Sequence, residues 1–315
     1  MNEIFYICAQ PATYYYAWQV DAMILSFQKV GSVDLNKVHI VSAAGANGLQ
    51  IDPAFKKVEE KWKLLGVKFD YYKDNRIQKR YISSIRPHIL KKHWEKYPWL
   101  KSKQFLYHDC DIVLSKPINF IDNGPKIVPV SDTISYIGAK YIMQKEHNLL
   151  AEMCEIVGID VEMVKNREKS SGGAQYYMKE GITYQFWDKV YKDSEKLFED
   201  ISKKVNLIKK EEPDWHEIQI WCADMWAVLW NLWKNGYETE VQDELDFCWG
   251  TQLQAKWEKH AIFHNAGVVK EESDMPFYKG KYQKVNPCNA PRPESKWASQ
   301  NYYDLVVEAY QETHK

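Results

Sequence analysis

Short apolar runs alternate with amphipathic segments over roughly the first 130 residues of the chain. Three runs have the length and the β-branched and aromatic content of strands: EIFYIC at 3–8, KVHIVSA at 37–43 and VKFDYY at 67–72. Apolar residues recur at helical spacing in three segments, at about 14–30, 53–65 and 87–97. Alternating strands and helices predict an α/β fold with a mostly parallel sheet flanked by helices.

A further strand is predicted in FLYHDCDIVLSKP at 105–117, which carries two acidic residues within an apolar run. Residues i and i+2 of a strand face the same side, so Asp109 and Asp111 are expected to aim both carboxylates at one point. A buried carboxylate needs a compensating group. The predicted occupant is a hard divalent cation, because such ions prefer oxygen ligands. KIVPV at 126–130 reads as the next strand.

The pattern of apolar residues predicts more helix in the second half of the chain. Amphipathic helices are expected at 139–157 and 185–205, and a long Trp-rich helix is expected from Pro213 to a C-cap at Gly236. SSGGAQYY at 170–177 reads as a flexible loop, whose two glycines either admit a substrate or make a turn. The tail, from about residue 278, reads as an extended wrap over the surface.

A second chemical signal lies in AIFHNAGV at 261–268, where His264 ends a short apolar strand and Gly267 follows. A single histidine in this setting is more often structural, but a neutral imidazole would complete a manganese site with two carboxylates. Downstream, Lys279 and Lys281 flank a glycine. Glycine permits close approach of the backbone to a ligand, and lysine suits phosphate as a point charge.

A third signal is Asp224, an acid within the Trp-rich segment WCADMWAV. One interpretation is a buried acid satisfied by a neighbouring hydroxyl or arginine. The other is a general base, or an acceptor of hydrogen bonds from sugar hydroxyls. The sequence favours neither.

Composition excludes some function classes. The 315 residues carry a formal net charge of −1, so no global positive field attracts nucleic acid. The six cysteines form no CxxC motif, and the N-terminal segment lacks the pattern of a signal peptide. No stretch approaches the length of a membrane span. These features together predict a cytoplasmic protein that uses no membrane partner. The motifs GxxxxGK[ST], GxGxxG, GxSxG and HExxH are absent, which removes several common enzyme classes.

A strand with Asp-x-Asp followed by a distal His-x-x-Gly near lysines resembles the GT-A class of nucleotide-sugar glycosyltransferases. A closer resemblance is to the hydroxyproline O-arabinosyltransferase and peptidyl-serine galactosyltransferase group. It spans about residues 5–285 and is carried by four stretches: YYYAWQVDAMILSF, SIRPHIL, FLYHDCDIVLSKPI and IWCADMWAVLWNL.

The resemblance implies a single GT-A, Rossmann-like domain over 1–315. About 1–135 would bind the nucleotide sugar, about 136–277 would form a helical acceptor side, and 278–315 would be the C-terminal wrap. It implies Mn²⁺ or Mg²⁺ held by Asp109, Asp111 and His264, with a nucleotide-sugar donor, most simply a UDP-sugar. The remaining expected donor contacts are Cys8, Gln10, Pro11, Arg86, Lys279 and Lys281, and Asp224 is the expected catalytic residue.

The sequence also departs from that group. The helix acid is Asp224 where the group has Glu, and its plant members are membrane-anchored secretory enzymes. The acceptor therefore stays open among a protein hydroxyl, a glycan, a small molecule and a hydroxymethylated base of phage DNA. Residue usage favours a phage or bacterial source. If the source is viral, the predicted location of the protein is the cytoplasm of the host. An arabinose- or galactose-type sugar is favoured. The alternatives are a metal-dependent phosphoesterase or nuclease, and a non-catalytic sugar- or nucleotide-binding module.

Overall fold

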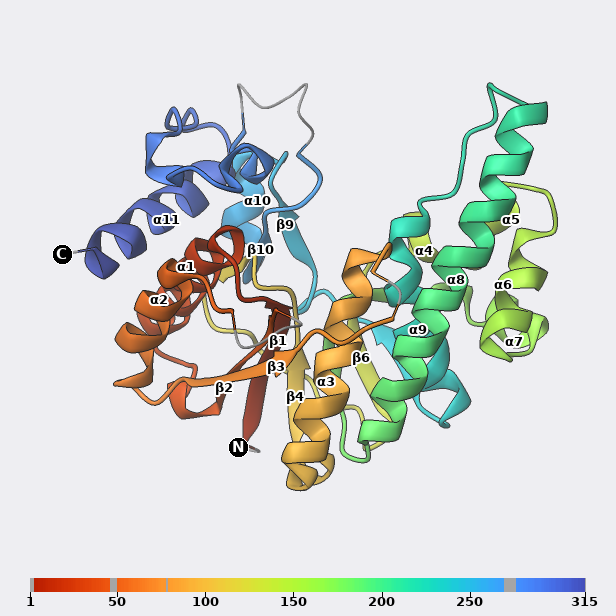
Figure 1. Ribbon diagram of the computed structural model, residues 1–315, viewed down its shortest axis with the longest axis horizontal. Coiled ribbons are helices and arrows are strands. Elements are labelled where there is room, and N and C mark those ends of the chain that lie inside the picture. Colours follow the sequence, from red (N-terminus) through yellow and green to blue (C-terminus); the bar gives the residue numbers. More distant parts are fainter. Residues whose placement is uncertain (1–2, 46–49, 78, 269–275, 315) are drawn as a thin grey trace. The chain divides into compact units, whose positions relative to one another are not determined.

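A computed structural model describes residues 3–45, 50–77, 79–268 and 276–314 (Figure 1). The chain divides into two compact units that interleave along the sequence. The first unit comprises mainly Asn75–Phe105 and Asp122–Asp243; the second comprises Ile4–Asp74, Leu106–Ile121 and Glu244–Lys315. The organisation of the chain as one functional domain stays a prediction.

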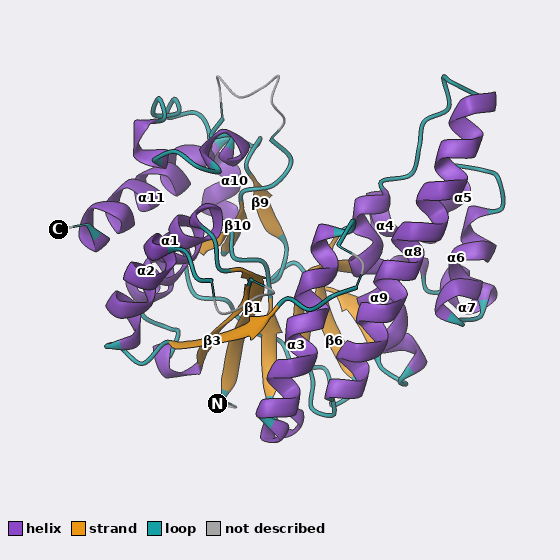
Figure 2. Ribbon diagram, viewed as in Figure 1, coloured by secondary structure: helices purple, strands orange, loops and turns teal. Residues whose placement is uncertain are grey.

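The described residues form one large sheet and one small sheet, shown with their helices in Figure 2. The large sheet has seven strands in the order β3-β2-β1-β4-β7-β6-β8, and the small sheet has the order β5-β10-β9. The predicted fold class, a mostly parallel α/β sheet flanked by helices with a more helical second half, is confirmed.

The second unit contains the N-terminal α/β segment. Its parallel strands are β1 (Ile4–Pro11), β2 (Val38–Ala44) and β3 (Lys68–Lys73), with Tyr6 opposite Val38. Helix α1 (Tyr14–Val30) packs against α2 (Pro53–Lys63), α11 (Ser299–Thr313) and β5 (Ile112–Leu114). The small sheet adds β9 (Phe247–Trp249) and β10 (Ile262–His264), and α10 (Gln254–Lys259) lies between them in sequence. Strand β2 is buried along its whole length, as expected for a strand covered on both faces.

The first unit is predominantly helical. Its longest helix, α8 (Tyr184–Glu211), packs against α3 (Ile85–Lys96), α6 (Leu149–Val157) and α9 (Ala223–Lys234). Strand β6 (Ile127–Asp132) pairs antiparallel with β7 (Gly172–Met178) and parallel with β8 (Glu238–Val241). Shorter helices complete it: α4 (Ile134–Ile137), α5 (Ala139–Met143) and α7 (Val161–Asn166). Its core includes four fully buried tryptophans: Trp94, Trp187, Trp226 and Trp230.

The prediction of one continuous strand across the Asp-x-Asp stretch is wrong. Residues Gln104–Tyr107 form β4 of the large sheet, whereas Ile112–Leu114 form β5 of the small sheet. Asp109 and Asp111 lie on the connection between them. The strand is interrupted because β5 pairs antiparallel with β10 instead of continuing along the large sheet.

Two predicted helices are shorter than the sequence suggested. The segment 139–157 is divided into α5 and α6, because Glu146, His147 and Asn148 adopt positive φ angles. The helix expected from Pro213 begins only at Ala223, after a 3-10 turn. Residues before it make tertiary hydrogen bonds instead: Trp215 donates to the Lys145 carbonyl at 2.9 Å, and the backbone N–H of Gln219 donates to the Tyr141 hydroxyl at 2.9 Å.

From Gly172 on, the segment SSGGAQYY belongs to strand β7 and is not a loop before a helix. A Cβ on Gly172 would lie 2.5 Å from the carbonyl oxygen of Ser131, so close packing against β6 explains this glycine. The tail also differs from an extended wrap, because its last residues form α11. Tyr302, Val306 and Ala309 are buried there, and α11 packs against α1. Within the described residues, no helix has both the length and the apolarity needed to cross a membrane.

Candidate metal and donor site

The local fold brings Asp109, Asp111 and His264 together within the second unit. After β4, the backbone N–H of His108 donates to the carbonyl of Ile7 in β1 at 3.2 Å. The chain then turns and enters β5, in which Ile112 lies opposite His264 of β10. The backbone N–H of Asn265 donates to the carbonyl of Asp111 at 3.0 Å. The antiparallel pairing of β5 and β10 thus fixes His264 beside the two acids.

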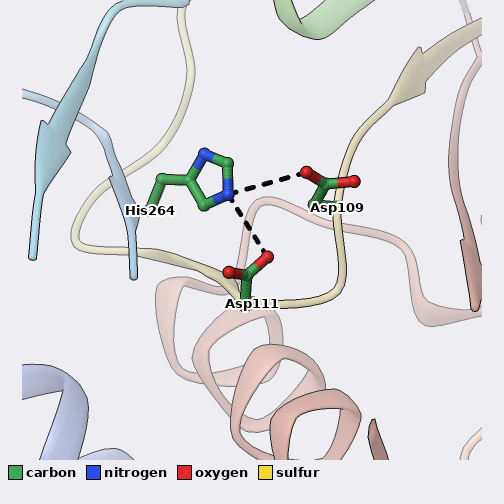
Figure 3. Close-up of side chains that lie close together, drawn as sticks. All are labelled: Asp109, Asp111 and His264. Atoms are coloured by element: carbon green, nitrogen blue, oxygen red, sulfur yellow. Dashed lines mark ion pairs between the residues drawn. The ribbon is translucent and has the colours of Figure 1, made fainter. Parts of the chain in front are cut away.

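The His264 imidazole points at both carboxylates (Figure 3). Its Nε2 lies 3.2 Å from Oδ1 of Asp111 and 3.6 Å from Oδ2 of Asp109. One potential ligand atom from each residue lies within 4.8 Å of the other two. Asp111 and His264 are buried, whereas 28% of the Asp109 side-chain surface is exposed. Solvent therefore reaches the cluster at Asp109.

Lys279 completes the charge balance of this cluster. Its ammonium pairs with Oδ2 of Asp111, the oxygen other than the one nearest His264. Burial raises the pKa of Asp111, but the charges of Lys279 and His264 outweigh it and hold that pKa well below its usual range. Burial lowers the pKa of Lys279, and Asp111 more than reverses that effect, so its pKa is raised. Both groups are therefore charged at neutral pH.

The residues present fit a divalent metal ion. Two carboxylates and one imidazole are the donor set that suits Mn²⁺, and the carboxylates also suit Mg²⁺. Another polar side chain of this region, His108, has a buried ring nitrogen, Nε2, without a hydrogen-bond partner among the described residues. Burial lowers the pKa of His108 to about 4, so its imidazole is neutral. That nitrogen is therefore left unsatisfied by the described residues.

The expected donor-binding segment at Cys8, Gln10 and Pro11 is part of β1, not of the loop that follows it. The strand extends this far because its parallel register with β2 continues to Pro11 opposite Ala43. Cys8 is buried, and desolvation raises the pKa of its thiol, with Asp109 adding to the effect. Gln10 is buried and donates to the Ser42 hydroxyl at 3.0 Å. Contact of these residues with a nucleotide stays a prediction.

Asp224 lies in the first unit, in the first turn of α9, and is 4% exposed. The Tyr81 hydroxyl donates to its Oδ1 at 2.6 Å, and Arg86 donates to its Oδ2 at 2.5 Å. Its own backbone N–H donates to the Tyr81 hydroxyl at 2.9 Å. Burial and the neighbouring Asp224 raise the pKa of Tyr81 well above its usual value, so the phenol keeps its proton. The sequence interpretation of Asp224 as a buried acid expected a neighbouring hydroxyl or arginine, and the structure contains both.

The structure brings four predicted site residues into one cluster: Asp109, Asp111, His264 and Lys279. Lys281 is exposed, on the same 3-10 turn as Lys279. Arg86 pairs with Asp224, an arrangement that the sequence did not predict for these two residues together. Tyr81 was missed, because 143 residues separate it from Asp224 and no local pattern marks it.

Comparisons with known proteins find only distant similarity. No protein-family model and no curated protein sequence matches the chain. Among solved structures, it is similar to the galactosyltransferase LgtC in complex with donor and acceptor sugar analogues, at 12% identity and a TM-score of 0.44, over 96% of this chain and 95% of that one.

Two further solved structures are also glycosyltransferases. The bifunctional enzyme WbbM matches at 8% identity and a TM-score of 0.49, over 100% of this chain and 52% of that one. GlyE of Streptococcus pneumoniae TIGR4 matches at 12% identity and a TM-score of 0.40, over 99% of this chain and 64% of that one. With TM-scores below 0.5, these similarities assign no function to this chain.

Proposed function

We propose that this protein is a metal-dependent glycosyltransferase that moves a sugar from a nucleoside diphosphate sugar to a hydroxyl group. The observation that carries the proposal is the cluster of Asp109, Asp111 and His264, with the ammonium of Lys279 on Asp111. Two carboxylates, an imidazole and a lysine together suit a metal-bound diphosphate.

The chemistry of the leaving group explains this combination. A nucleoside diphosphate leaves with about two negative charges, which must be stabilised as they develop. Asp109, Asp111 and His264 would hold Mn²⁺ or Mg²⁺, which when bound supplies Lewis-acid stabilisation of the diphosphate. Lys279 lies close enough to this cluster to add a positive charge, and the exposed Lys281 is a second candidate for a phosphate contact.

The donor is proposed to be a UDP-sugar of arabinose or galactose type, on the strength of the sequence resemblance alone. Within this proposal, the carboxyl end of β1 at Gln10 and Pro11 lies beside the nucleotide, as expected for ligands of open α/β sheets. Because the Cys8 side chain is buried, that residue would contribute through its backbone.

Asp224 is proposed as the catalytic base if the reaction inverts the sugar configuration, and as a group that positions the sugar if configuration is retained. Both of its oxygens already accept hydrogen bonds, from Tyr81 and Arg86. These contacts fix the direction of the carboxylate, which serves either role. Arg86 is proposed to hold Asp224 in addition to its predicted contact with the donor phosphates.

A metal-dependent phosphoesterase or nuclease is the second candidate. A two-metal hydrolase needs more ligands close together, and within the described residues the cluster of potential metal ligands has three members. A sugar- or nucleotide-binding module without turnover would use the same cluster. A hydrolase would make different products from the proposed reaction, and a binding module would make none.

The test is to incubate the protein with UDP-, GDP- and CMP-sugars and Mn²⁺, with water as the acceptor of the sugar, and to measure the intact UDP, GDP or CMP released. We expect release from one donor class, reduced about 100-fold or more in Asp111→Asn. Asp304→Asn, a change at an exposed aspartate in the same unit, is the matched control and should keep full activity. Release of inorganic phosphate or cleavage of nucleic acid would favour a hydrolase. Normal turnover in Asp111→Asn would refute the site assignment.

A further inference from the structure

Trp221 is an exposed aromatic side chain in the first unit, immediately before α9. Its exposed fraction is 57%, whereas Trp226 and Trp230 of the same segment are fully buried. The ring of Tyr136 in α4 lies 6.5 Å from it, centroid to centroid, with the two planes only 24° apart. The two rings thus form a nearly parallel aromatic pair, here called the aromatic platform.

The aromatic platform is tied to Asp224. The Tyr81 hydroxyl that donates to Oδ1 of Asp224 also lies 2.8 Å from the carbonyl oxygen of Trp221. One buried hydroxyl therefore fixes the backbone of Trp221 relative to the carboxylate three residues later. Tyr81 is itself held by stacking on Phe198, with ring centroids 4.5 Å apart. The position of the platform is set by packing, not by a mobile loop.

Trp221 is exposed and Tyr136 is half-buried, so the pair presents aromatic surface that the described residues do not fully cover. Burial of so large a ring as Trp221 would stabilise the fold, and aromatic rings with one apolar face and a polar edge are enriched at interfaces. A flat aromatic face stacks equally well on the apolar face of a sugar ring or on a nucleic-acid base. Local charge distinguishes the two ligand classes.

The chain segments that lead to the platform do not favour a polyanion. Those before Trp221 and Tyr81 carry four acidic residues and four basic ones, so their formal charges cancel: Glu211, Glu212, Asp214 and Glu217 against Lys79, Arg80, Lys209 and Lys210. Nucleic-acid binding surfaces instead show a dense cluster of positive charge. A neutral ligand needs no such cluster, and a carbohydrate supplies both an apolar ring face and hydroxyls.

We propose that Trp221 and Tyr136 form an acceptor subsite that binds a neutral carbohydrate by stacking, so that the acceptor is a glycan. The role of this sugar as the acceptor rests on the proposed function. The sugar-binding surface itself is inferred from the contacts of Trp221 and Tyr136. It selects the glycan from the acceptors that the sequence left open, and places it in the segment expected to form the acceptor side.

The test is direct binding without donor or metal. Saturation-transfer NMR is recorded on the full chain with lactose, cellobiose, maltose, mannobiose and chitobiose at millimolar concentration. We expect transfer to at least one of these sugars. The signal should be lost in Trp221→Ala, partly kept in Trp221→Phe, and unchanged in Trp99→Ala, which alters another exposed tryptophan of the same unit. The unfolding temperature of each variant shows that it is folded.

Three outcomes would overturn the inference: no transfer to any of these sugars, transfer that persists in Trp221→Ala, or binding of a single-stranded oligodeoxynucleotide that depends on Trp221. The proposed function is tested separately, by measuring nucleotide release by the wild-type protein. Nucleotide release without Trp221-dependent sugar binding refutes this inference alone. Trp221-dependent sugar binding without nucleotide release supports the sugar surface and refutes the transferase assignment.

Discussion

Lys279 and Asp111 form an ion pair inside the candidate metal cluster, and the second oxygen of Asp111 lies 3.2 Å from Nε2 of His264. The ammonium thus neutralises the same carboxylate that a metal ion would use. Lys279 and a metal ion would therefore compete for the same carboxylate. The affinity for the metal then depends on the strength of the ion pair between Lys279 and Asp111. This relationship gives the cluster a testable electrostatic signature.

Replacing Lys279 by methionine should tighten the binding of Mn²⁺ to the nucleotide-free protein by about tenfold, because the ion no longer competes with an ammonium for Asp111. Binding of UDP with Mn²⁺ should weaken, because a positive charge near the diphosphate is lost. Free Mn²⁺ is measured by electron paramagnetic resonance. Lys281→Met, which alters an exposed lysine two residues away, is the control for Mn²⁺ binding to the nucleotide-free protein only. Weaker Mn²⁺ binding in Lys279→Met would contradict this account.

The pair of Arg86 and Asp224 should be strongly coupled. Asp224 is 4% exposed, so Arg86→Met leaves a buried carboxylate without its cation and should cost about 3 kcal/mol in free energy of unfolding. Asp224→Asn should also destabilise, and the double variant should lose less than the sum of the two. Urea unfolding of all four proteins gives the coupling energy. Simple additivity would show that the pair contributes nothing as a unit.

Stability should fall in mild acid because of His39 in β2. Burial lowers the pKa of His39 from 6.5 to about 4, with Lys68 adding to the effect. The unfolded chain therefore binds a proton that the folded chain excludes between these values. Its contribution is complete above pH 6.5 and is lost as the pH falls toward 4, by up to about 3 kcal/mol.

The effect of His39 can be isolated with His39→Gln, which removes the titrating group. Urea unfolding at pH 7 and at pH 5 gives the pH dependence of each protein, and the difference between wild type and variant removes the contribution of the carboxylates. The wild type should lose more stability than the variant over this interval. Equal losses would mean that His39 is not excluded from protonation in the folded state.

Gly172→Ala should destabilise the first unit by about 2–4 kcal/mol, since the new Cβ would meet Val130 at 2.3 Å and the Ser131 carbonyl at 2.5 Å. Gly45→Ala, just after β2, is the milder comparison, because the atoms nearest its new Cβ belong to the flexible side chain of Gln50, at 3.0 Å or more. The measurement is the urea midpoint of each variant. A neutral effect of Gly172→Ala would revive the interpretation that this glycine serves substrate entry.

The N-terminal strands and helices could be predicted because their signals are local. Helix α1 was expected over the same span that the structure shows, as its apolar positions recur at helical spacing. Periodicity does not report where a strand changes sheet, so the break between β4 and β5 was missed. Likewise, Gly172 of β7 is explained by its contacts with β6, some 40 residues earlier in the chain.

The members of the metal cluster could be chosen from residue chemistry, but their geometry could not. Asp109 and Asp111 were expected to converge as alternate residues of a strand, whereas they converge because a turn delivers the chain to β10 and His264. The partners of Asp224 were foreseen in kind, a hydroxyl or an arginine. Their identities depend on packing between segments separated by about 140 residues, which a single sequence does not reveal.

A nucleotide and a divalent metal ion are proposed to bind together at the Asp109–Asp111–His264 cluster. The decisive experiment measures the melting temperature of the protein with UDP, GDP, CMP and their sugars, each with and without Mn²⁺, because ligands of the folded state raise it. We expect a shift that requires both Mn²⁺ and one class of nucleotide and that disappears in Asp111→Asn. No shift with any nucleotide at millimolar concentration, or an equal shift without metal, would refute joint binding at this cluster.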